Sequence, residues 1–282
     1  MLALPRRRIA GLLALLGVAV FVAAGTLLPF IKLGYANPSL TMWTAPHPRV
    51  RLQVLTWVGV ILVIAVLAGV ALARRSRPRA AFPAGALIGA GAVGLALQLR
   101  VVGFTGGDVP SWGWMGVSIG SALILGSGFV GATGPGSEGR RGASGSGWVA
   151  LAGTVALVAA MFLPVAEFIY GADQVRTAEI LDLDTPRRFP LQYAAFPAIV
   201  LVLVAGGTAL IFRGREVLGA GLLIGTALPT LALVWGMKAG YESFRAGFWV
   251  ALAGGVLLVL AAVLATRRGE GSGESGPEPA PA

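Results

Sequence analysis

Long, uninterrupted apolar segments dominate the chain. A helix rises about 1.5 Å per residue, so about 20 apolar residues are needed to cross roughly 30 Å of hydrocarbon. Lipid offers backbone N–H and C=O groups no hydrogen-bond partner, so each segment of this length is predicted to be a transmembrane helix. Eight such segments occur, at approximately residues 9–30, 52–73, 82–102, 112–132, 148–170, 191–212, 217–237 and 245–266.

Few charged side chains are available to cover a water-facing surface. Apolar residues make up 56% of the 282 positions and charged residues only 12%, whereas soluble domains carry roughly 25% charged residues. The net charge of +10 does not indicate a nucleic-acid partner, because the basic residues form short clusters between apolar segments. Cysteine is absent, which excludes disulfides and thiol catalysis. Abundant Gly, Ala and Arg with only two lysines favour a bacterial protein from a high-GC genome.

The distribution of arginine predicts the orientation of the chain. With a cytoplasmic N-terminus, 13 basic residues lie on the inner side and 9 on the outer side, as the positive-inside rule requires. We therefore expect a multi-pass plasma-membrane protein with both termini in the cytoplasm. As an alternative, the first apolar segment could be a signal peptide, because Val22 and Ala24 have the spacing of a cleavage site.

Two halves of the chain share landmarks in the same order. The segment LLPFIKLGYA (27–36) resembles FLPVAEFIYGA (162–172), and GALIG (85–89) resembles GLLIG (221–225). The corresponding landmarks lie about 135 residues apart, which indicates an internal repeat. The repeat also requires the first apolar segment as a helix, which argues against cleavage.

The repeat predicts the domain organisation. A unit with four spans begins and ends on the same side, so the two units should point the same way and be related by a pseudo-twofold axis along the membrane normal. The predicted fold is an all-α polytopic membrane protein with eight transmembrane helices in two parallel four-helix repeats. The expected parts are a first repeat 1–133, a flexible cytoplasmic linker 134–147, a second repeat 148–268 and a disordered cytoplasmic tail 269–282.

The two longest outer loops, 31–51 and 171–190, are predicted to form a structured external cap. Within the second loop, residues 173–183 are expected to form a short amphipathic helix. Lys32 and Glu167 occupy matching positions in the two repeats, near the outer ends of helices one and five. They either form an ion pair between the repeats, or line a polar site that opens outward, or lie separately in water at headgroup level.

Other charged residues of the outer loops are further candidates. Asp182 and Asp184 have a spacing that can hold a divalent cation, but neighbouring arginines could equally neutralise them. No metal site, cofactor or catalytic residue is predicted, because no nucleotide-binding, zinc or triad motif occurs. The remaining outer-face candidates are Arg100, Asp108, Lys238 and Glu242, which either reach the headgroups or line a substrate path.

Pairs of glycines four residues apart predict close helix packing. These pairs are Gly85 and Gly89, Gly116 and Gly120, Gly221 and Gly225, and Gly236 and Gly240.

The sequence favours a non-enzymatic membrane protein, an accessory, scaffold or interaction subunit that contacts a partner protein or lipid through outer loops 31–51 and 171–190. Few ionisable residues lie within the apolar segments, whereas ion-coupled transporters usually need them there. One alternative is a transporter or flippase for an apolar or lipid-like molecule with a cleft between the repeats. Another is a membrane-embedded transferase that uses the outer acidic loop. A filled space between the repeats would favour the first reading, and an open polar groove the second.

Overall fold

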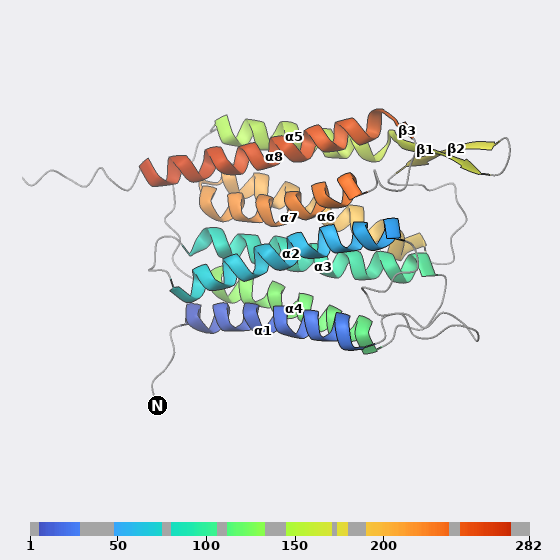
Figure 1. Ribbon diagram of the computed structural model, residues 1–282. Helices are drawn as coiled ribbons and strands as arrows, with labels where there is room; N and C mark the ends of the chain where they lie inside the picture. The colour runs from blue at the N-terminus through green and yellow to red at the C-terminus, as the bar shows by residue number, and fades with distance from the viewer. Residues whose placement is uncertain are drawn as a thin grey trace, which may run out of the picture.

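The protein is a bundle of parallel and antiparallel helices with a small sheet at one end (Figure 1). The computed structural model describes residues 6–28, 48–74, 80–105, 112–132, 145–170, 174–179, 190–236 and 243–271. The helices in these ranges are α1 Arg6–Leu27, α2 Pro48–Arg74, α3 Ala81–Thr105, α4 Trp112–Ala132, α5 Gly145–Met161, α6 Pro190–Phe212, α7 Glu216–Gly236 and α8 Ala246–Gly271.

Seven of the described helices are long and apolar enough to cross a membrane. The exception is α5, which has 17 residues and is also apolar. The chain is therefore a helical protein with the composition and span lengths of a multi-pass membrane protein, and a lipid bilayer is its expected surroundings.

The fifth predicted helix was too long. Residues 148–170 were expected to form one helix, but α5 ends at Met161 and strand β1 runs from Pro164 to Tyr170. The last turn tightens, because Phe162 N donates to Ala159 O (3.1 Å) and Leu163 N donates to Ala160 O (3.4 Å). Pro164 then lacks an N–H and disfavours a helical conformation at the preceding residue, so the chain leaves the helix there.

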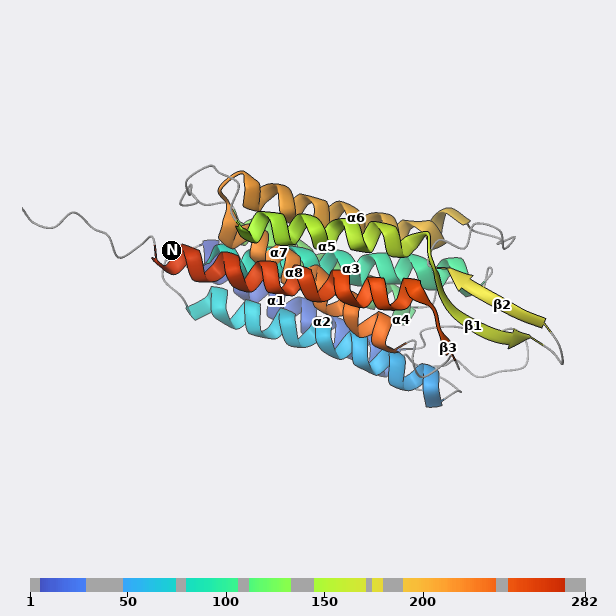
Figure 2. The same cartoon turned by 90° about the horizontal axis from the view of Figure 1, so that it is seen from above.

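At 174–179, the described part of the predicted amphipathic helix 173–183, the chain forms a strand of a three-stranded antiparallel sheet. Strand β2 Gln174–Glu179 pairs with one edge of β1, and β3 Ser243–Phe244 pairs with the other, giving the order β2-β1-β3. Helical periodicity predicted the wrong structure for 174–179, because strand pairing satisfies the backbone there instead. Figure 2 shows the sheet projecting beyond the ends of α5 and α8.

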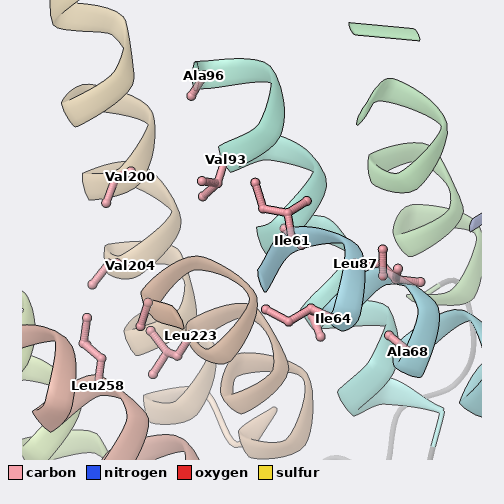
Figure 3. Packing of buried hydrophobic residues seen from close by; sticks show 14 of the residues in the cluster. Ile61, Ile64, Ala68, Leu87, Val93, Ala96, Val200, Val204, Leu223 and Leu258 are labelled. Atoms are coloured by element: carbon pink, nitrogen blue, oxygen red, sulfur yellow. The ribbon is translucent and has the colours of Figure 1, made fainter. Parts of the chain in front are cut away.

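The helices form layers with α3 and α7 in the middle. Helices α1 and α4 pack together at one edge of the bundle, and α5 and α8 pack together at the opposite edge (Figure 1). Between them, α2 contacts α1, α3 and α7, while α6 contacts α5, α7 and α3. The core lies along the central helices, where Val93 of α3, Val204 of α6 and Leu223 of α7 are fully buried (Figure 3). Of the seven long apolar helices described, α3 is the most enclosed, because 78% of its apolar stretch is buried inside the protein.

Exposed aromatic side chains mark the ends of the spans. Trp112, Phe162, Trp235 and Trp249 are exposed near the end of the bundle that carries the sheet, and Trp148 is exposed near the opposite end. Tryptophan is enriched where a bilayer meets water, because its ring is largely apolar while its N–H is polar. These positions fit the two boundaries of a membrane.

Candidate functional site

Among the glycines that the structure describes, those at the crossing of α3 and α7 leave the least room for a side chain. A Cβ added at Gly89 would lie 2.7 Å from the backbone carbon of Gly225 and 2.8 Å from Leu222 O. A Cβ at Gly221 would lie 2.9 Å from the backbone carbon of Phe82 and closer still to its oxygen. Contacts this short leave room only for hydrogen at these positions, so the two backbones pack directly against each other.

The contacts at this crossing are reciprocal. Gly85 faces Leu218 and Leu222 of α7, and Gly221 faces Phe82 and Ala86 of α3. Gly221, Leu218 and Leu222 occupy the places in α7 that Gly85, Phe82 and Ala86 occupy in α3. Each helix therefore presents the same face to the other.

Glycines also allow close packing in the two outer helix pairs, α1 with α4 and α5 with α8. A Cβ at Gly17 of α1 would lie 2.8 Å from Gly120 O of α4, and a Cβ at Gly153 of α5 would lie 2.9 Å from Gly254 O of α8. Gly116 faces Ala24 of α1. Close packing is thus confirmed for the predicted pairs at 85 and 89, 116 and 120, and 221 and 225, whereas Gly240 lies outside the described residues.

The predicted polar candidates are only partly placed by the structure. Lys32, Asp108, Asp182, Asp184, Lys238 and Glu242 lie outside the described residues. Arg100 belongs to α3 and Glu167 to β1, and only their backbones are described. Glu167 pairs with Thr177 of β2 and with Ser243 of β3, so it lies in the central strand of the sheet. The sequence had predicted it near the outer end of helix five. The ion pair with Lys32 stays a hypothesis.

Two buried polar side chains, on α3 and α4, were not anticipated as a site. The side chain of Gln98 is only 1% exposed, and neither its amide nitrogen nor its amide oxygen has a hydrogen-bond partner. The Ser121 hydroxyl is likewise buried and has no hydrogen-bond partner. It faces Gly94 of α3, where an added Cβ would lie 2.8 Å from the Ser121 Oγ. Trp114 Nε1 donates to the backbone oxygen of Gln98 at 3.3 Å.

The corresponding positions of the second half are apolar. In the repeat predicted from the sequence, Val234 of α7, which is buried, corresponds to Gln98, and Phe248 of α8 corresponds to Trp114. If this repeat is correct, Gln98 has no polar counterpart in the second half. A glutamine within an apolar segment was the available sequence signal, but its burial depends on tertiary packing.

Replacing Gln98 with methionine should stabilise the protein. The flexible methionine side chain has a similar volume, and it removes two buried polar atoms whose lack of partners costs about 1–3 kcal/mol. Thermal unfolding in detergent would measure the effect. Thr208→Val is the matched control, because it breaks the 3.1 Å hydrogen bond between the Thr208 and Thr154 hydroxyls and should lower stability by about 0.6 kcal/mol. A loss of stability in Gln98→Met would contradict the assignment of unpaired groups.

Among the side chains that the structure describes, the ionisable groups lie at or next to the helix ends. The buried polar residues in the described part of the chain are Gln98, Ser121, Ser127, Ser146, Thr208 and Thr226, none of which is ionisable. In the same residues, no group of three or more His, Cys, Asp or Glu side chains could hold a metal ion. No protein-family model, no curated protein and no solved structure matches this chain.

Proposed function

We propose that the chain is a non-enzymatic multi-pass protein of the plasma membrane that acts as an accessory or scaffold subunit. In this proposal two parallel four-helix repeats form a rigid membrane body, and both termini lie in the cytoplasm. The outer segments 31–51 and 171–190 contact a partner protein or lipid.

The helix contacts support the two-repeat arrangement. The pairing of α1 with α4 has its counterpart in the pairing of α5 with α8, and the pairing of α3 with α6 has its counterpart in that of α7 with α2. The reciprocal glycine contacts of α3 and α7 fit a pseudo-twofold axis that passes between these two helices. A rotation about this axis would exchange the halves without changing their direction in the membrane.

The glycine crossing is the observation that favours a scaffold over a transporter. A transporter that binds its cargo between two repeats needs space near the bilayer midplane. Here the backbones of Gly89 and Gly225 approach so closely that a single Cβ would clash. The axis is therefore filled by protein, which supports a rigid body better than two halves that rock around a cargo.

The sheet supports a contact role for the outer face. It projects beyond the helix ends, and its strand β2 is an edge strand. An edge strand presents unpaired backbone groups that another chain can pair with. β2 lies within the proposed contact segment 171–190.

Site-specific photo-crosslinking in living cells that produce the protein tests this proposal. A benzophenone amino acid at Val175 in β2 should form a discrete adduct with a partner protein or lipid, because β2 belongs to the proposed contact segment. The same probe at Ser144 in the linker is the control and should not form that adduct. The proposal fails if the Val175 probe gives no adduct, or if the linker probe gives the same adduct.

A further inference from the structure

The described ionisable side chains gather at one end of the bundle. Arg6, Arg8, Arg74, Arg213, Arg215 and Arg267 are exposed there, and we call this set the inner basic surface. It lies at the end where the N-terminus is marked in Figure 1, away from the sheet. Of the described ionisable side chains, only Arg245 lies at the sheet end, and Glu216 is the one acidic member among them.

Helix packing brings some of the arginine-bearing helix ends together. A Cβ on Gly11 of α1 would lie 2.8 Å from the backbone nitrogen of Ala73, so the start of α1, which carries Arg8, meets the end of α2, which carries Arg74. In the second half, Gly147 of α5 meets the ring of Phe212, which directly precedes Arg213. The α1–α2 contact thus joins two helix ends that both carry arginine.

The electrostatics of the helix ends add to this positive charge. Helices α1, α3 and α5 begin at this end, and none has an acidic residue in its first turn. The N-terminus of a helix carries a partial positive charge, so the basic residues that begin α1 oppose the stability of the helix itself. Helix α7 also begins at this end, and Glu216 in its first turn provides one compensating carboxylate.

The turn between α6 and α7 shows how two of the guanidinium groups are presented. Gly214 adopts a positive φ of 81° and is buried, while Arg213 and Arg215 on either side are exposed. Nearby, Trp148 is 59% exposed and packs edge-on against Phe212 at 5.8 Å. A tryptophan at the membrane boundary places the adjacent arginines at the depth of lipid headgroups.

We propose that the inner basic surface binds the phosphate groups of anionic phospholipids in the leaflet that it faces. Arginine suits this role because its planar guanidinium donates hydrogen bonds to phosphate in a fork and stays charged at all relevant pH values. Basic groups beside membrane helices attract anionic lipids in this way. This site is separate from the outer contact segments and does not depend on what binds there.

Thermal unfolding in nanodiscs tests the proposal, with intrinsic tryptophan fluorescence as the signal. Replacing part of the phosphatidylcholine with phosphatidylglycerol should raise the Tm of the wild type by about 5 °C, because lipid binds the folded state. The triple variant Arg74→Gln/Arg213→Gln/Arg215→Gln should lose most of this rise. Arg245→Gln, at the sheet end, is the matched control and should keep it.

Three results of this experiment would contradict lipid binding by the inner basic surface. A triple variant that keeps the full rise, or an equal loss in Arg245→Gln, would overturn the proposal. So would an equal rise produced by inorganic phosphate in pure phosphatidylcholine, which would indicate a free-anion effect. If the triple variant does not fold, the single variants Arg74→Gln and Arg213→Gln replace it, and each should lose part of the rise. Because both nanodisc leaflets contain the same lipid, the result does not depend on the orientation in the cell.

Discussion

Replacing Gly221 with alanine should lower the free energy of unfolding by about 3 kcal/mol, near the upper end of the cost of overpacking. The added Cβ would lie 2.9 Å from the backbone carbon of Phe82 and 3.0 Å from the backbone nitrogen of Ala86. Backbone atoms of a helix cannot move aside as a flexible side chain can, so α3 and α7 would have to separate. Thermal unfolding of the purified protein in detergent would measure the loss.

Gly59→Ala is the matched control for this substitution. Gly59 also lies within a helix, but a Cβ there would meet nothing within 4 Å. Alanine favours a helix over glycine by about 1 kcal/mol, so this variant should be as stable as the wild type or more stable. Equal destabilisation by the two substitutions would show that the α3–α7 crossing has no special role.

A cysteine at Val93 should resist a membrane-impermeant maleimide from both sides of the membrane. Val93 of α3 is fully buried against the central helices, and cysteine is small enough to take its place. Because the chain has no cysteine of its own, the introduced thiol is the only possible target. Labelling in intact cells and in inverted vesicles, followed by gel-shift detection, would measure access.

One further variant and a denatured control accompany this measurement. Val204→Cys of α6, also fully buried, should behave as Val93→Cys does. Both cysteines should react once the protein is denatured, which shows that the thiols are intact. Rapid labelling of Val93→Cys in native membranes would reveal a water-filled path between the repeats and would favour a transporter.

The sequence was informative about the helices because span length and hydropathy have one dominant physical cause. Residues 112–132 were predicted and α4 is Trp112–Ala132, since lipid requires the backbone to satisfy its own hydrogen bonds. Helix α2 begins earlier than predicted, at Pro48, because proline is well suited to the first turn of a helix. Hydropathy failed at 164–170, because an apolar strand and an apolar helix look alike in composition.

The candidate site divides in the same way. The glycine pairs at 85 and 221 were predictable, because a residue without a side chain in an apolar helix serves close packing. The burial of Gln98 and of Ser121 was not predictable, because it depends on how the helices pack against one another. The pairing of Glu167 with Ser243 was also missed, because it joins segments far apart in the sequence.

The side of the membrane on which the linker lies tests the central claim most directly. That claim is that two four-helix units run in the same direction, which requires the short helix α5 to cross the membrane. A single cysteine at Ser144 should stay unlabelled by an impermeant maleimide in intact cells and react after permeabilisation. Labelling of Ser144→Cys in intact cells would place the linker outside and contradict the parallel repeats.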